Sequence, residues 1–434
     1  MLEWINTYLL GTAVPVMLIA VGIYFGFLLK WFHVFHPIRS AALAFGGGGR
    51  SAFRALCLAL AGTLGVGNIV GVAAALAMGG SGAVFWMWVS AFFAMILKYA
   101  ETVLAIRHRR TAKGGELEGS AMYYIEDCFL KRKTRGSFLA LCFAFLLVLN
   151  ALTMGSVIQI GAVSDAMWGA FSVPEFLCSS LIAAVTLILM LKGRNSVMGA
   201  TEKIVPLMTL GYFIISVWAL VLRADRLPSA FADIFRSAFD GRAAMGGAVG
   251  FLTNKALRFG AMRGLISNEA GCGTSPMAHA EADCDGAVQG VFGIFEVFVD
   301  TMILCTVTAL VIIVSGVSLE GEFMAITLGA YSDILGRGAG EFLAVGVLFF
   351  GFATVLCWSQ YGIRGSEYLV GKNGKRIFII LYTAAMAASG VLGGEVAWQI
   401  ADMSIGGMTL INICVLLLMS REIKEESKKL LCPY

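Results

Sequence analysis

Long apolar runs, separated by short charged segments, make up most of this sequence. An α-helix needs about 20 apolar residues to cross the hydrocarbon core of a membrane, and about 11 such runs are present. Hydrophobic residues make up 59% of the 434 residues and charged residues only 14%, whereas a soluble domain has roughly 25% charged residues. This apolar excess would leave large exposed patches on a soluble protein. The composition therefore excludes a soluble enzyme, a secreted disulfide scaffold and a disordered chain, and it predicts an all-α polytopic membrane protein. The predicted spans are 13–31, 54–77, 83–106, 137–164, 176–191, 201–222, 245–265, 287–316, 342–361, 377–392 and 396–419.

Two of these spans are interrupted by glycines at matching positions. The second span contains three glycines between Gly62 and Gly67, and the seventh opens with a glycine-rich run, Gly246–Gly250, followed by Gly260 and Gly264. Interrupted helices at equivalent positions of two halves are typical of secondary transporters with inverted repeats. We therefore predict one transmembrane domain over residues 1–434, in which an extra helix (13–31) precedes two five-helix repeats (54–222 and 245–419).

The distribution of Lys and Arg predicts the orientation. With the amino terminus outside, about five of every six Lys and Arg residues fall in the inner segments. We therefore expect a multi-pass protein of the cell membrane with a cytoplasmic carboxy terminus. The segment 227–241 contains Pro228 and alternating acidic and basic residues, and it is interpreted as an outer helix that lies on the surface.

The glycine-rich run from Gly62 to Asn68 is the first candidate binding site. Unwound backbone is tolerated at membrane depth only where it is buried in protein or lines a wet cavity. Freed N–H groups near Gly67 suit a carboxylate, because they lie at the positive end of the following half-helix. Freed carbonyls between Ala61 and Leu64 suit an ammonium group or a small cation. The alternative is that the glycines only allow close helix packing.

Polar side chains on other spans are further candidates. Thr354 supplies the hydroxyl in the first half of the ninth span, where it can add an oxygen ligand to a cation, and Trp358 follows one turn later as a pocket wall. The alternative for this pair is a threonine bonded to its own helix and a packing tryptophan. Gln159 in the fourth span must find polar partners, either in a binding site or on a neighbouring helix.

Charged residues inside predicted spans are the third signal. Glu296 and Asp300 lie four residues apart on one face of the eighth span, and Lys255 and Arg258 lie in the seventh. Such charges are functional candidates by default, but the two positive and two negative charges also fit a structural ion pair between the two helices. Glu101, one turn from Lys98 in the third span, is interpreted as an interfacial pair.

The inner segment after the seventh span carries four side chains of the types that bind metals. They are His279, Glu281, Asp283 and Asp285. Their spacing matches no standard zinc pattern. We interpret the segment as a hydrated acidic loop, so no metal site is predicted.

Several stretches resemble the alanine or glycine:cation symporter family, whose members have a LeuT-type fold of five-plus-five inverted repeats. The matching stretches are GTLGVGNIVGVAAALAMGGSGAVFWMW (62–88), KYAETVLAIRHR (98–109), AMYYIE (121–126), ALRFGAMRGLISNEAGCGTSPMAHA (256–280), VFVDTMILCTVTALVI (297–312) and CWSQYGIRGSEYLVG (357–371). The resemblance implies sodium-driven import of a small neutral amino acid, alanine or glycine. It implies no cofactor besides sodium as the coupling ion, no nucleic-acid partner and a monomer in the bilayer.

The resemblance also implies roles for individual residues. The substrate would be held by the backbone of Thr63, Gly65, Val66 and Gly67, with Gln159 and Trp358 shaping the pocket. The cation would lie between the carbonyls of Ala61 and Leu64 and the hydroxyl of Thr354, with Asn68 near a second site. The chain departs from the family pattern at Val66, Ser156, Ala353 and Gln360, where the family usually has Thr, Asn, a hydroxyl residue and Tyr.

Other functions stay open at this stage. A symporter of the same fold would couple to protons through Glu296 or Asp300. An intramembrane enzyme would use the segment from His279 to Asp285, and a passive channel would need no coupling ion at all.

Overall fold

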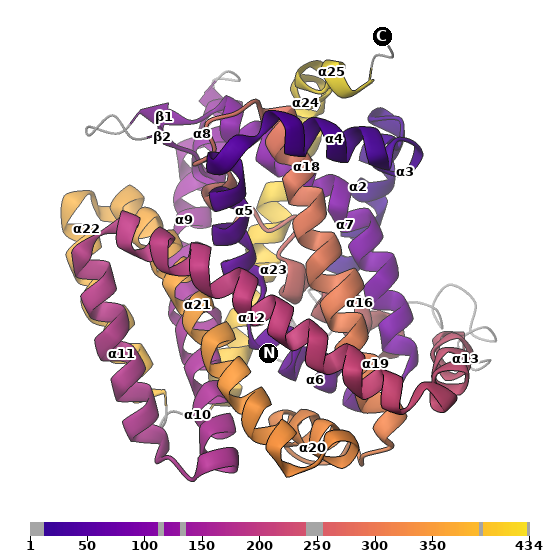
Figure 1. Cartoon of the computed structure of the whole chain (residues 1–434). Helices are drawn as coiled ribbons and strands as arrows, with labels where there is room; N and C mark the ends of the chain where they lie inside the picture. Colours follow the sequence, from indigo (N-terminus) through magenta and orange to yellow (C-terminus); the bar gives the residue numbers. More distant parts are fainter. Residues whose placement is uncertain (1–12, 112–116, 131–135, 240–254, 390–393, 432–434) are drawn as a thin grey trace.

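The structure is a computed structural model that describes residues 13–111, 117–130, 136–239, 255–389 and 394–431. Within these residues it is nearly all helical, and the long helices run roughly side by side (Figure 1). The first half contains α2 (Val14–Leu28), α3 (Phe32–Phe35), α4 (Pro37–Gly47), α5 (Gly49–Thr63), the 3₁₀ turn η2 (Val66–Asn68), α6 (Val70–Gly79), α7 (Gly82–Arg107), strands β1 (Arg110–Thr111) and β2 (Leu117–Glu118), α8 (Ala121–Leu130), α9 (Gly136–Leu152), the π-helical segment η3 (Thr153–Val157), α10 (Ile158–Phe171), α11 (Glu175–Lys192) and α12 (Arg194–Leu222). The second half contains η4 (Ala224–Arg226), α13 (Leu227–Ala238), α16 (Lys255–Asn268), α17 (Pro276–His279), α18 (Gly286–Val297), the π-helical segment η5 (Phe298–Cys305), α19 (Thr306–Ser315), α20 (Phe323–Leu335), α21 (Arg337–Val370), α22 (Lys372–Ala388), α23 (Gly394–Leu418), α24 (Ser420–Glu426) and α25 (Lys428–Leu431).

The predicted spans fall on helices wherever the structure describes them. Seven helices in the described residues are long and apolar enough to cross a membrane, and the pair α5 and α6, bent by 59°, makes an eighth. The first predicted span is α2, which has 15 residues, and the seventh and tenth lie on α16 and α22. The parts of the seventh and tenth spans at 245–254 and 390–392 lie outside the described residues.

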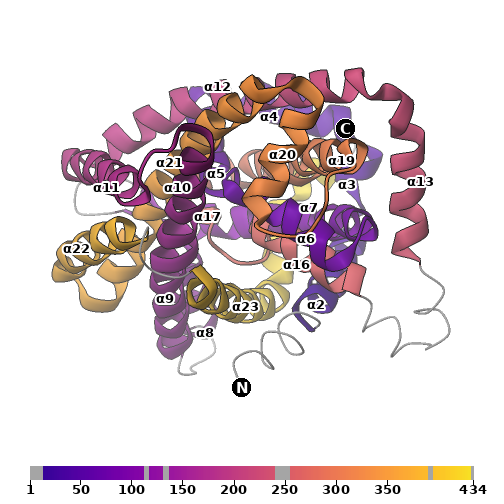
Figure 2. The same ribbon diagram turned by 90° about the horizontal axis from the view of Figure 1, so that it is seen from below.

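One apolar helix was not predicted. Helix α20 has only 13 residues, too few for a span, and it packs against α6, α10, α19 and α21. Its Thr327 hydroxyl lies 3.4 Å from the carbonyl oxygen of Ile69, next to the interrupted helix. Helix α20 therefore covers the end of the bundle beside α6 (Figure 2).

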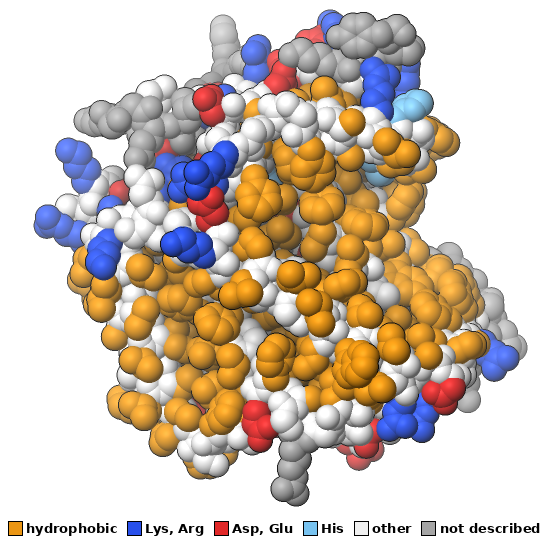
Figure 3. All heavy atoms as spheres, in the orientation of Figure 1, with side chains coloured by type: hydrophobic (Ala, Val, Ile, Leu, Met, Phe, Trp, Pro, Cys, Tyr) orange, Lys and Arg blue, Asp and Glu red, His pale blue; other side chains and the backbone are white. Residues whose placement is uncertain are grey.

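Two helices lie across the long helices. Helix α4 runs crosswise at one end of the bundle (Figure 1). Helix α13 is seen end-on in Figure 1 and lengthwise in Figure 2, and it buries Ala230, Ile234 and Ala238 along one face. This agrees with the surface helix predicted at 227–241. Hydrophobic side chains cover the middle of the face shown in Figure 3, and Lys and Arg gather toward the end that carries α4 and α24, with a smaller group near α13.

Small residues bring α7 and α16 into close contact at the centre. A Cβ atom added at Gly260 would overlap the backbone of Ala83, and one added at Gly264 would lie 3.6 Å from the backbone of Met87. Helices in membranes associate through such close contacts, because lipid is as apolar as their side chains. These two glycines therefore lie in a continuous helix and serve packing, not an interruption.

Candidate substrate and cation site

The predicted interruption of the second span is present. Helix α5 ends at Thr63, Leu64 and Gly65 leave helical geometry (Gly65 φ −114°, ψ −160°), and one 3₁₀ turn precedes α6. Residues Thr63 to Val70 are buried, so the unwound backbone faces protein and not lipid. Elements α10, α16, α21 and η5 all contact η2.

Side chains from two other helices contact the freed backbone. The side-chain oxygen Oε1 of Gln159, on α10, accepts a hydrogen bond from the backbone N–H of Val66 at 3.1 Å. The hydroxyl of Thr354, on α21, lies 3.5 Å from the carbonyl oxygen of Leu64 and donates to the Phe350 carbonyl at 3.0 Å. Within the described residues, no backbone N–H bonds to the carbonyl of Ala61. The interruption therefore presents the Leu64 carbonyl toward α21 and the Val66 N–H toward α10.

Trp358 completes this side of the site. Its indole ring is fully buried, and its nitrogen Nε1 has no hydrogen-bond partner in the described part of the chain. The ring packs so closely against η3 that a Cβ at Gly155 would lie 2.6 Å from it, and it meets the ring of Tyr361 edge-on at 5.5 Å between centroids. Because Gly155 has no side chain, the indole ring of Trp358 packs directly against η3, one turn before Gln159.

A second interruption lies later in the chain than the sequence indicated. Helix α16 is unbroken from Lys255 to Asn268, and the backbone then unwinds before α17. Glu269, Gly271 and Gly273 adopt positive φ angles of 52°, 86° and 78°. The run Gly246–Gly250 lies outside the described residues. Gly271 and Gly273 are the signal that could have located this segment, because glycine adopts such angles at little cost.

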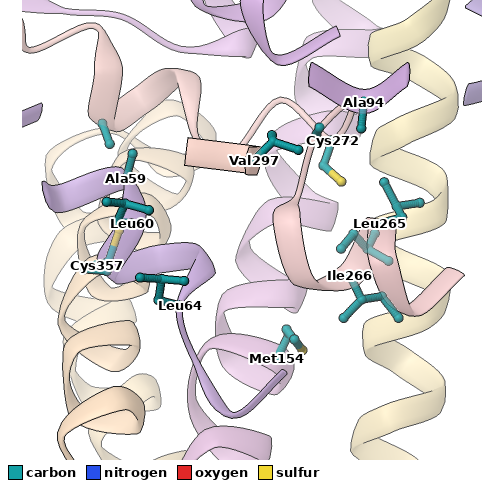
Figure 4. Packing of buried hydrophobic residues seen from close by; sticks show 14 of the residues in the cluster. Ala59, Leu60, Leu64, Ala94, Met154, Leu265, Ile266, Cys272, Val297 and Cys357 are labelled. Carbon is teal, nitrogen blue, oxygen red and sulfur yellow. The ribbon is translucent and has the colours of Figure 1, made fainter. Parts of the chain in front are cut away.

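The two interruptions lie against each other. Helix α16 contacts η2 and α6, and α17 contacts α5. Figure 4 shows Leu60 and Leu64 at the first interruption, Ile266 and Cys272 on either side of the bend in the second, and Met154 of η3 between the two groups in this view.

Asp300 connects the two interruptions. Its carboxylate accepts hydrogen bonds from Asn68 Nδ2 at 2.7 Å, from Ser267 Oγ at 2.8 Å and from Thr301 Oγ1 at 2.7 Å. All four side chains are at most 2% exposed. The other amide atom of Asn68, Oδ1, has no partner among the described residues and is free to act as an oxygen ligand.

Glu296 has different partners from those predicted. Lys98 Nζ lies 3.4 Å from its Oε1, His279 Nε2 lies 2.7 Å from its Oε2, and the Ser275 hydroxyl lies 2.8 Å from Oε2. The ion pair therefore joins α7 to α18, and the predicted pair between the seventh and eighth spans is wrong for Glu296. Lys255 is exposed at the start of α16, and the Arg258 guanidinium lies 5.8 Å from the ring centroid of Phe259.

The expected pairing of Lys98 with Glu101 is also wrong, because Lys98 pairs with Glu296 instead, and both Lys98 and Glu101 are completely buried. Glu101 Oε1 accepts hydrogen bonds from the backbone N–H of Gly273 at 3.0 Å and from Asn412 Nδ2 at 2.5 Å. No pattern in the sequence identified Asn412 as a partner, since it lies 311 residues away on α23.

The segment from His279 to Asp285, predicted to be a hydrated acidic loop, is only partly exposed. Glu281 is nearly buried and pairs with Arg194 and, at 2.7 Å, with Arg364. Asp283 is exposed, and its backbone N–H donates to the Ser51 hydroxyl at 2.7 Å. In the part of the chain that the structure describes, no three His, Cys, Asp or Glu side chains are arranged to hold a metal.

Known proteins agree with this architecture. The sequence pattern of the sodium:alanine symporter family matches residues 1–431 of this chain. The sodium/alanine symporter AgcS of Methanococcus maripaludis is 35% identical over 439 residues, which cover 98% of this chain and 95% of AgcS. The probable sodium/glutamine symporter GlnT of Bacillus subtilis is 31% identical over 429 residues, which cover 96% of this chain and 87% of GlnT.

Solved structures show the same fold. The structure of MhsT in complex with L-phenylalanine has a TM-score of 0.63 at 14% identity and covers 89% of this chain and 95% of its own. A Na⁺-coupled sialic acid symporter has a TM-score of 0.52 at 12% identity, over 98% of this chain and 86% of its own. The fold and its paired interruptions define a secondary transporter of the LeuT type.

The chain belongs to the sodium:alanine symporter family. It is a cation-coupled amino-acid symporter and a multi-pass membrane protein, and its family and fold are those of transporters, not enzymes.

Proposed function

We propose that this protein imports alanine or glycine together with sodium by alternating access around the two interruptions. The observation that carries the proposal is the arrangement of Gln159 and Thr354, which bond to opposite sides of the unwound backbone between Leu64 and Val66. Donors and acceptors are thereby separated over the length of one small zwitterion.

The proposed substrate site uses the backbone N–H groups of Val66 and Gly67 for the carboxylate, because they precede α6 and carry its positive dipole end. The substrate carboxylate would replace Gln159 as the acceptor for the Val66 N–H. The backbone of Thr63 and Gly65 would hold the rest of the amino acid, and Trp358 would limit the length of its side chain. The relative AgcS is named a sodium/alanine symporter, which indicates a small substrate for that protein.

The proposed cation site consists of the carbonyls of Ala61 and Leu64 and the hydroxyl of Thr354. Unwound backbone carbonyls coordinate Na⁺ in transporters of this kind. Ala353 provides no second hydroxyl on α21, so the carbonyls must supply most of the ligands. The unpartnered Oδ1 of Asn68, held beside Asp300, is the proposed ligand of a second cation.

The proposed orientation has the amino terminus outside and the carboxy terminus in the cytoplasm. Its support is the concentration of Lys and Arg at the end of the molecule that carries α4 and α24 (Figure 3). We propose that the unit in the bilayer of the cell membrane is a monomer with a single transmembrane domain.

Uptake by purified protein in liposomes tests this function. An inward sodium gradient should drive accumulation of labelled alanine or glycine above equilibrium, and the same gradient of potassium should not. Uptake that stops at equilibrium would show a passive channel, and equal uptake with potassium, lithium or a proton gradient would remove sodium from the proposal.

A further inference from the structure

The second interruption encloses a group of buried charges that the proposed substrate and cation sites do not use. Three carboxylates (Glu101, Glu269 and Glu296) lie there with one lysine, Lys98, and all four side chains are at most 2% exposed. Two further titratable side chains face Glu101, Cys272 in the interruption and Tyr124 on α8, while His279 on α17 contacts Glu296.

The hydrogen bonds decide how these charges are balanced. Lys98 and Glu296 neutralise each other at 3.4 Å. The amide nitrogen of Gln289 lies 2.8 Å from His279 Nδ1, so Nδ1 accepts a hydrogen and Nε2 donates to Glu296. Glu101 and Glu269 therefore have no counterion of their own.

Glu101 is the more incomplete of these two carboxylates. Its Oε1 accepts from Gly273 and Asn412, but its Oε2 has no hydrogen-bond partner in the described residues, and no Lys, Arg or His nitrogen among them lies within 4.0 Å of the carboxylate. Glu269 Oε2 accepts from the Thr274 hydroxyl at 2.6 Å. An ionised carboxylate without partners is costly to bury, and such a group takes up a proton instead.

The surroundings of Glu101 suit a proton better than a metal cation. The groups that bond to its Oε1 are N–H donors, and the remaining amide oxygen of Asn412 accepts from the Tyr124 hydroxyl at 2.5 Å. Among the described residues, no three His, Cys, Asp or Glu side chains are arranged to hold a metal ion.

We propose that Glu101 binds a proton when the second interruption packs against it and releases that proton when the interruption moves during transport. An O–H bond forms at Oε2 with a proton taken from water, and the same proton returns to water when the site opens. This inference rests on the proposed transport cycle, because Gly273, which bonds to Glu101, belongs to the segment that we expect to move.

The test compares the wild type with Glu101→Gln, which keeps a side-chain oxygen for the Gly273 N–H but binds no proton. In liposome assays with an inward sodium gradient, from neutral to alkaline pH, wild-type uptake should fall by up to about tenfold per pH unit above its midpoint. Uptake by E101Q should stay within about twofold over the same range, by the same linkage. The matched control, Glu425→Gln, removes an exposed carboxylate on α24 and should keep the wild-type slope. A wild-type slope in E101Q would overturn the proposal.

A second measurement keeps the test valid if E101Q does not fold or if the proposed substrate is wrong. Infrared difference spectra of the purified wild type should show a protonated carboxyl C=O band that disappears on raising the pH. Absence of that band in the wild type overturns proton binding, whatever the transport assay gives. Failure of the wild type to accumulate alanine or glycine at any pH would instead count against the proposed function.

Discussion

The side-chain oxygen of Gln159 lies 3.1 Å from the backbone nitrogen of Val66 and accepts its hydrogen bond across the interior of the bundle. This contact joins α10 to the unwound part of the second span. Gln159 thus occupies the position that we propose for the substrate carboxylate.

Replacing Gln159 with leucine should therefore destabilise the protein in the absence of alanine. The Val66 N–H would be left buried and unbonded, which costs about 1–3 kcal/mol of stability. Thermal unfolding in detergent should show a lower midpoint for Gln159→Leu. Added alanine should raise that midpoint more than it raises the wild-type midpoint, because the substrate carboxylate then bonds to Val66. An alanine-induced shift no larger than in the wild type would contradict the proposed carboxylate position.

Thr354 provides the test of the cation site. Thr354→Val keeps the shape of the side chain but removes the hydroxyl next to the Leu64 carbonyl. Loss of one ligand worth about 1.4 kcal/mol corresponds to about a tenfold higher sodium concentration for half-maximal uptake. Thr354→Ser restores the hydroxyl and should restore the sodium dependence. An unchanged sodium dependence in Thr354→Val would place the cation elsewhere.

Gly65 is expected to tolerate no side chain. A Cβ there would lie 2.8 Å from both Gln159 Oε1 and Thr354 Oγ1, although its φ of −114° suits any residue. Overpacking of this kind costs about 1–3 kcal/mol, so uptake by Gly65→Ala should fall by about tenfold or more. Gly199→Ala is the matched control, because no atom lies within 4 Å of its added Cβ, and its uptake should be normal. Normal uptake by Gly65→Ala would show that the substrate and cation bind elsewhere.

The buried ion pair of Glu296 and Lys98 should be important for stability. Glu296→Gln removes the carboxylate that lies 3.4 Å from the buried Lys98 Nζ, and breaking such a pair costs about 3–5 kcal/mol. Denaturant unfolding should show this loss, and the double variant Lys98→Met with Glu296→Leu should recover much of it. The control is Glu425→Gln, whose exposed pair with Arg421 contributes about 0–1 kcal/mol. If Glu296→Gln were as stable as the control Glu425→Gln, a structural role for the buried pair would be ruled out.

Much of the first half of the site could be predicted from the sequence. Three glycines in six residues weaken a helix enough to locate its interruption, and polar residues in apolar spans, such as Gln159 and Thr354, must find partners. The second interruption was placed too early, because glycines that pack a helix against its neighbour look the same in sequence as glycines that unwind it. Gly260 and Gly264 are of the first kind, and Gly271 and Gly273 are of the second.

The pairing of buried charges could not be read from the sequence. The balance of two positive and two negative charges suggested partners for Glu296 on the adjacent span, yet Lys98 lies 198 residues away and Asn412 lies 311 residues from Glu101. Hydrogen bonds between distant segments depend on which helix faces meet, and no local pattern records this.

The sequence by itself determined that this chain lies in a membrane as a bundle of helices with an interrupted second span, because apolar run length and glycine content act locally on each helix. Only the tertiary structure decided that Gln159, Thr354 and Trp358 meet at that interruption, and that the second interruption closes over Glu101. These contacts come from the packing of helices against one another, and its energy depends on shape and burial across the whole chain.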